Sequence, residues 1–151
     1  MDTLSYKTLS ANKVTANKQW FVDDASGQTL GRMASKVAKV LRGKFKTNFT
    51  PHADCGDYVI IVNSGKVVMT GNKMADRRIF SHTGYPGGQK RISPSEMLEK
   101  DETSLVRHAL RGMLPKNKLG AEILRNCYIY SGADHDHEAQ KPKALNLNDL
   151  K

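Results

Sequence analysis

The spacing of apolar residues predicts alternating strands and helices in the first half of the chain. A short apolar run at residues 20–22, followed by polar turn residues, predicts a strand. From Leu30 the apolar positions recur at steps of three and four, which predicts an amphipathic helix that ends at Gly43. The nearly continuous β-branched run of residues 57–63 is typical of a strand covered on both faces.

The second half continues this alternation with shorter elements. Residues 66–69 predict a second short strand or a continuation of the one before, and residues 77–83 predict a further strand. Ser93, Pro94 and Glu96 match a capping box with proline at the first helical position, so a helix is expected to begin there. The remaining predicted elements are a helix over residues 103–113, a short helix over 119–125 and a strand over 127–130.

Strands that alternate with helices, with the most apolar strand in the middle, predict an α/β fold. We expect a three-layer α/β/α domain around a mostly parallel four-stranded sheet. A chain of 151 residues suits one compact domain, which we place at residues 19–133. The polar residues 1–18 predict a flexible N-terminal arm, and the polar stretch 134–151 predicts a flexible C-terminal tail.

The charge balance changes this picture by pointing to a partner. The chain has 24 lysines and arginines against 15 acids, a formal net charge of +9. A charge of this sign and size indicates a polyanion as the partner. No apolar stretch reaches the roughly 18 residues of a membrane span, and the N-terminus lacks the apolar block of a secretory signal. We therefore expect a cytoplasmic protein without a membrane partner.

The positive charge is concentrated in three acid-poor windows, which span residues 25–53, 58–95 and 103–121. The first and third windows contain no acid, and the second contains only Asp76. A single window of this kind is equally well explained as a solvated face. Three windows on one side of a fold would present a field that attracts phosphate and releases counterions on binding. Nucleic acid is therefore the predicted partner.

Candidate catalytic and metal-binding chemistry is sparse. His52, Asp54, Cys55 and Asp57 carry groups that bind metals, but a structural zinc site normally needs a second ligand pair at short spacing. A polar loop that enters the following strand explains them better. Cys55 and Cys127 are expected to be two buried thiols in a reducing compartment. No phosphate-loop motif and no convincing triad is present, so we expect no catalytic residue, metal or cofactor.

The glycine-rich loop GYPGG, residues 84–88, is a different kind of candidate. Glycines allow a backbone to approach another chain closely, and His82, Tyr85 and Lys90 flank or lie within this loop. RNA backbone or a splayed base would be a suitable neighbour. The alternative interpretation is a plain surface turn.

Six strings in the chain, taken together and in this order, resemble one family, the bacterial large-subunit ribosomal protein thirteen family. They cover roughly residues 20–142. The strings are WFVDDASGQTLGRMAS from Trp20, TPHADCGDYVIIVN from Thr50, KVVMTGNK from Lys66, HTGYPGG from His82, GMLPKNKLG from Gly112 and YSGADHDHEAQKP from Tyr130.

The resemblance implies a structural component of the large ribosomal subunit that lies against large-subunit ribosomal RNA and takes part in early assembly. Its implied partners are that RNA and neighbouring large-subunit ribosomal proteins, with no small-molecule substrate. The RNA-facing positions that it suggests are Arg32, Arg42, Lys44, Lys46, Lys73, His82, Tyr85, Lys90, Arg111, Lys116 and Lys118.

Two other functions are compatible with the residues alone. A basic α/β domain would also suit a messenger RNA-binding translational regulator. An α/β enzyme is a more distant alternative, since a catalytic triad is set by the fold and not by sequence spacing. Sedimentation with large ribosomal subunits would separate these alternatives from the ribosomal one.

Overall fold

A four-stranded parallel sheet is the centre of the computed structural model, which describes residues 10–12 and 14–145. The strand order is β5–β2–β1–β6, and each neighbouring pair is parallel. This arrangement confirms the predicted α/β class and the mostly parallel four-stranded sheet. The strands are β1 (Trp20–Asp24), β2 (Tyr58–Val62), β5 (Cys127–Ile129) and β6 (Lys143–Ala144).

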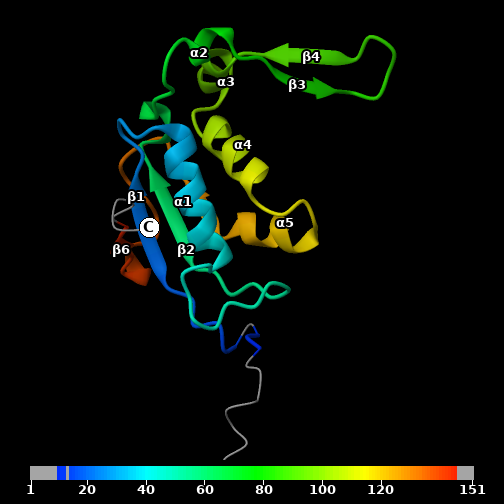
Figure 1. Cartoon of the computed structure of the whole chain (residues 1–151). Helices are drawn as coiled ribbons and strands as arrows, with labels where there is room; N and C mark the ends of the chain where they lie inside the picture. Colours follow the sequence, from blue (N-terminus) through cyan, green and yellow to red (C-terminus); the bar gives the residue numbers. More distant parts are fainter. Residues whose placement is uncertain (1–9, 13, 146–151) are drawn as a thin grey trace, which may run out of the picture.

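The helices α1 (Leu30–Arg42), α4 (Ser104–Met113) and α5 (Lys118–Arg125) form a layer beside the sheet (Figure 1). The apolar stripe of α1, which includes Met33 and Val37, is buried against Val59 and Ile61 of β2 and against α4. Burying this stripe removes apolar surface from water, which is the main stabilising contribution of such a layer. The helix ends at Gly43, whose positive φ of 80° is unfavourable for residues with a side chain. The prediction for residues 30–43 is confirmed.

Among the described residues, the opposite face of the sheet is covered by the C-terminal segment and not by α-helices. Trp20 stacks on Tyr58 with ring centroids 4.5 Å apart, and His137 lies over Trp20 and Tyr128 at 5.0 and 4.3 Å. Beneath them Ile60 is fully buried. The segment then forms a 3₁₀ turn, η3 (Glu138–Gln140), and strand β6.

Residues 134–145 therefore belong to the folded domain, although their polar composition predicts a tail. β6 pairs with β1, and the backbone N–H of Leu145 donates to the Val22 carbonyl at 2.8 Å. Residues 14–18 of the predicted arm also contact the domain, since Ala16 is buried. The rest of the predicted arm and tail, residues 1–9, 13 and 146–151, lies outside the described residues.

The long segment that connects β2 to α4, an excursion from the main domain, contains the smaller elements. A β-hairpin projects from its far end, away from the sheet (Figure 1). The capping box is confirmed, since the Ser93 hydroxyl accepts from the Glu96 N–H and the Glu96 carboxylate accepts from the Ser93 N–H. The elements are η2 (Ser64–Lys66), α2 (Lys73–Asp76), β3 (Ile79–His82), β4 (Gln89–Ile92) and α3 (Pro94–Lys100).

Two sequence predictions for this excursion need correction. Residues 66–69 form no strand of their own, because Val68 makes only one isolated bridge, to Thr29. The strand predicted at 77–83 exists as β3, but it pairs with β4 outside the main sheet. Among the described helices, none has the length and apolar character needed to cross a membrane.

Candidate nucleic-acid interface

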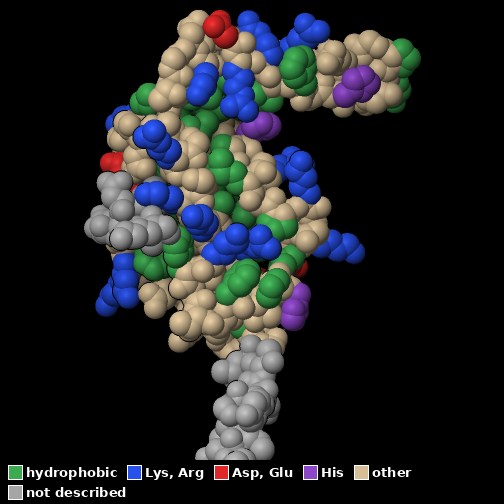
Figure 2. Space-filling view, in the orientation of Figure 1, with side chains coloured by type: hydrophobic (Ala, Val, Ile, Leu, Met, Phe, Trp, Pro, Cys, Tyr) green, Lys and Arg blue, Asp and Glu red, His purple; other side chains and the backbone are tan. Residues whose placement is uncertain are grey.

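The cationic sides of the helices face outward because their apolar sides are buried together. Arg32 lies on the first turn of α1, and Arg107 and Arg111 lie on α4; all three are exposed. On the face shown in Figure 2, lysines and arginines are spread over most of the surface and acidic side chains are few. The three acid-poor windows thus contribute to a broad positive surface, as the sequence predicts.

A hollow between α1, α4 and the segment before α2 is lined by residues of all three windows. We call it the α1–α4 hollow; its volume is about 600 Å³. Arg32 and Lys73, both predicted as RNA-facing, line it. Arg77 and His108 also line it, although the sequence did not single them out. Their place in the acid-poor windows is a signal in the sequence that could have found them.

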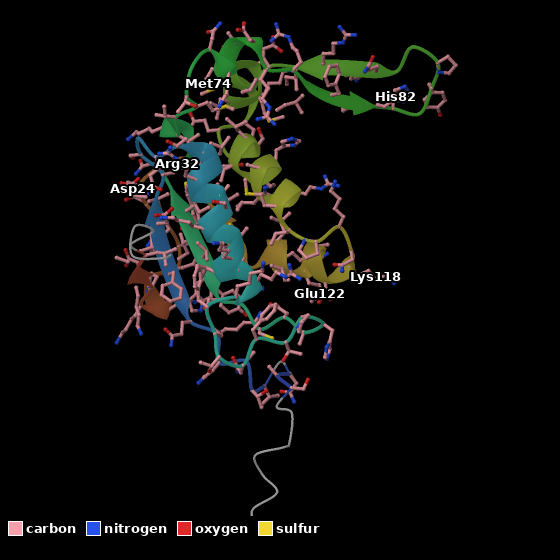
Figure 3. All side chains as sticks on the ribbon, viewed as in Figure 1. Asp24, Arg32, Met74, His82, Lys118 and Glu122 are labelled. Carbon is pink, nitrogen blue, oxygen red and sulfur yellow. The ribbon has the colours of Figure 1, made fainter. Side chains whose placement is uncertain are left out.

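The hairpin carries a second group of predicted residues at a distance from the hollow. His82 lies on the projecting hairpin, far from Arg32 at the start of α1 (Figure 3). Tyr85 at the tip is 76% exposed, and Lys90 is also exposed. The His82 Nδ1 atom accepts from the Gly84 N–H at 2.9 Å, which holds the loop where Gly84 adopts a φ of 91°. Gly84 and Gly87, whose φ is 71°, are thus favoured by the backbone conformation of this loop.

Phe80 is the hairpin residue that the sequence prediction missed. Its side chain is 58% exposed, and the Arg91 guanidinium lies 5.5 Å from the ring centroid. An exposed aromatic ring beside a guanidinium is a surface on which nucleic-acid bases stack. The sequence of β3 does not predict this exposure, because a phenylalanine in a strand is usually buried.

Lys46 differs from the other predicted RNA-facing lysines because its ammonium group contacts an acidic residue of the protein. Its ammonium forms an ion pair with Asp57 at 2.7 Å and donates to the carbonyl oxygens of Ala16 and Asn17 at 2.9 and 3.2 Å. It therefore ties the N-terminal segment to the start of β2. Its neighbour Lys44 is exposed and remains available to a ligand. We leave Lys46 out of the interface proposed below.

This difference predicts opposite effects for two neighbouring substitutions. Lys46→Gln removes the charge that compensates Asp57, so we expect it to lower the free energy of unfolding by about 1–3 kcal/mol. Lys44→Gln should leave stability within about 0.5 kcal/mol, as is usual for an exposed site. Urea unfolding of the two purified variants measures both values. Equal stabilities would show that the Lys46 contacts contribute nothing to the fold.

The remaining predicted cations lie toward the other end of the helical layer. Arg42 packs its guanidinium 5.8 Å from the Phe49 ring centroid. Lys116 and Lys118 are exposed around the start of α5, where the Asn117 side chain caps the helix by accepting from the Gly120 N–H at 2.8 Å. Lys118 and Glu122 both lie on α5, one turn apart (Figure 3). This acid weakens the positive potential around Lys118.

Two of the candidate metal ligands, Asp54 and Asp57, form ion pairs within the fold. The Asp54 carboxylate forms an ion pair with Lys18 at 2.5 Å and accepts from the Asn126 amide at 3.0 Å. Cys55 is buried and free, as is Cys127, which confirms the prediction of two buried thiols. Burial raises the pKa of Cys127 to about 12, so this thiol stays protonated at neutral pH.

Polar groups also gather at the carboxyl ends of β1 and β2, where α/β enzymes bind ligands. The Asp24 carboxylate accepts hydrogen bonds from the Ser26 N–H and from the Asn63 amide, which lower its pKa. Burial raises the pKa of the neighbouring Asp23 carboxyl, which accepts from the Gln28 amide at 3.1 Å. The contact between Asn63 and Asp24 joins the ends of the two strands.

Comparison with known proteins gives a single consistent result. A family model described as "Ribosomal protein L13" matches residues 18–136. The "Large ribosomal subunit protein uL13" of Trichlorobacter lovleyi is 52% identical over 141 residues, which are 93% of this chain and 99% of the relative. The proteins of the same name from Symbiobacterium thermophilum and Chlorobium luteolum are 48% and 45% identical, over 93% and 97% of this chain and 99% and 98% of the relatives.

Proposed function

The chain belongs to the ribosomal protein L13 family, and from this premise we propose that it binds large-subunit ribosomal RNA through its exposed lysines and arginines. The family resemblance drawn from the six strings is confirmed. The chain is a protein of the large ribosomal subunit and not an enzyme.

The observation that carries the RNA proposal is the lack of acidic partners for the cations proposed to face RNA. Among the described residues, the two ion pairs use Lys18 and Lys46, and both lysines are largely buried. The proposed RNA-facing cations form no ion pair within the described part of the chain, so their charge remains available to phosphate. The positions proposed are Arg32, Arg42, Lys44, Lys73, His82, Tyr85, Lys90, Arg111, Lys116 and Lys118, with Arg77, His108, Phe80 and Arg91 added by their places in the structure.

We further propose that the protein joins the subunit early in its assembly. The apolar core is formed within the domain itself, so the domain does not need RNA to complete it. Its neighbours in the particle would be other large-subunit proteins, for which Phe45 offers an exposed apolar side chain. A cytoplasmic location follows from a function in the ribosome.

Sedimentation tests the proposed function. A tagged chain expressed in cells should travel with large subunits through a sucrose gradient at moderate salt. Replacing Lys73 and Lys44 by glutamine should weaken its binding to ribosomal RNA. The dependence of log affinity on log salt should flatten by about one unit for each phosphate that the variant no longer neutralises. A chain that stays at the top of the gradient, free of subunits, would contradict the proposal.

A further inference from the structure

The α1–α4 hollow takes residues from all three acid-poor windows. Arg32 comes from the first window, Lys73 and Arg77 from the second, and His108 from the third. No aspartate or glutamate is among the described residues that line it. The fold thus concentrates positive charge from three distant segments at a single concave place, and a ligand held there must be an anion.

The lining of the same hollow also has an apolar part, which we call its floor. Val68 and Met113 line it, although their side chains are 47% and 43% exposed, and Leu30 and Met69 lie beside them. Large apolar side chains left uncovered inside a concave site usually mark a contact surface for a ligand. A ligand that suits this hollow therefore combines an anionic group with an apolar face.

We propose that the α1–α4 hollow binds one unstacked nucleotide of the RNA. Its base lies on Val68 and Met113, and its phosphate lies between Arg32, Lys73 and Arg77. The inference rests on the proposed function, which requires RNA but does not name a nucleotide site. Bases that are splayed out of a loop or bulge are the usual targets of proteins that recognise RNA locally. The volume of about 600 Å³ falls in the range typical of small-molecule sites.

Two details of the walls favour this occupant. The first turn of α1 carries no acid, and Thr29 makes no side-chain capping bond, so the positive end of the helix dipole adds to the field of Arg32. Gly31 and Gly112 have no atom within 4 Å of the place where a Cβ would stand, which leaves open space at the walls. An acidic peptide from a neighbouring protein would satisfy the cations, but its carboxylates would leave the apolar floor uncovered.

Cross-linking in the assembled subunit tests the proposal. Cells that express the full chain are grown with 4-thiouridine, large subunits are isolated, and ultraviolet cross-links to the protein are mapped by mass spectrometry. We expect cross-linked nucleotides on the peptides that contain Val68 and Met113. Co-sedimentation of the chain with large subunits is scored in the same samples, so loss of incorporation reports on the proposed function separately. Normal incorporation with cross-links confined to other parts of the chain overturns the nucleotide site.

A matched pair of substitutions provides the second measurement. Val68→Asp places a negative charge on the floor of the hollow, whereas Val14→Asp adds the same charge at a valine that is 90% exposed elsewhere. Val68→Asp should weaken binding to ribosomal RNA by about tenfold, and Val14→Asp by less than about twofold. Arg77→Gln, at an exposed position, should also weaken binding if Val68→Asp does not fold. Equal effects of the two aspartates, or a protein peptide cross-linked in the hollow, would overturn the proposal.

Discussion

The Gly56→Ala variant is expected to lose more than about 3 kcal/mol of unfolding free energy. A Cβ at position 56 would lie 1.6 Å from the carbonyl oxygen of Leu41 and 2.4 Å from its carbonyl carbon. Both atoms belong to the backbone near the end of α1, so no side-chain rotation relieves the clash. Small domains have only about 5–15 kcal/mol of unfolding free energy in total. This single methyl group should therefore remove a large share of it.

Gly112→Ala is the matched control for this clash. Gly112 lies within α4, and no atom stands within 4 Å of the added methyl group. Alanine is the better helix former, so this variant should be as stable as the parent or more stable by up to about 1 kcal/mol. Thermal and urea unfolding of the two variants compare them directly. A Gly56→Ala protein that unfolds at the same urea concentration as Gly112→Ala would show that the approach of α1 to β2 is looser than the structure has it.

The contrast between these two glycines illustrates what the sequence can predict of this fold. Helix α1 was predictable because its apolar stripe, its period and the terminal Gly43 are local signals. The need for glycine at position 56 depends on Leu41, which comes from an earlier element. Such close approaches follow from tertiary packing and leave no local pattern.

The strands show the same division between local and tertiary signals. β2 was predictable because its β-branched run is buried on both sides. β4 and β6 were not, since Gln89, Lys90 and Arg91 are exposed and Lys143 and Ala144 pair at an edge without burial. Neither strand needs an apolar pattern, because backbone hydrogen bonds pair it with its neighbour. The sequence therefore predicts the right number of strands in the sheet but not the identity of the fourth.

The candidate interface was predictable only as a charge distribution. The acid-poor windows indicated a polyanion, and the structure places most of their cations at the surface. Which cations remain available depends on contacts across the fold. These contacts made Lys46 a structural residue, and the packing of the helices placed His108 and Arg32 in the same hollow. Lys46 and Asp57 are 11 residues apart along the chain, and Arg32 and His108 are 76 apart. No local sequence pattern therefore predicts that either pair comes together in the fold.

The double variant Phe80→Ala/Tyr85→Ala is expected to bind ribosomal RNA at least about 30-fold more weakly, since each base stacked on an aromatic side chain contributes about 1–3 kcal/mol. Both rings are exposed on the hairpin, so stability should not change. Stacking involves no charge, and the slope of log affinity against log salt should therefore stay the same. Binding measured by filter retention at several salt concentrations, with urea unfolding beside it, separates these effects.

Lys90→Gln is the counterpart on the same hairpin, because it removes a charge and leaves both rings in place. It should lower the salt slope by about one unit and weaken binding less than the double variant does at moderate salt. The pair of variants thus distinguishes two ways in which the hairpin can bind RNA. If the double variant bound as tightly as the parent while Lys90→Gln did not, the hairpin would act through phosphate contacts alone. In that case the exposure of Phe80 and Tyr85 would have to serve a protein neighbour.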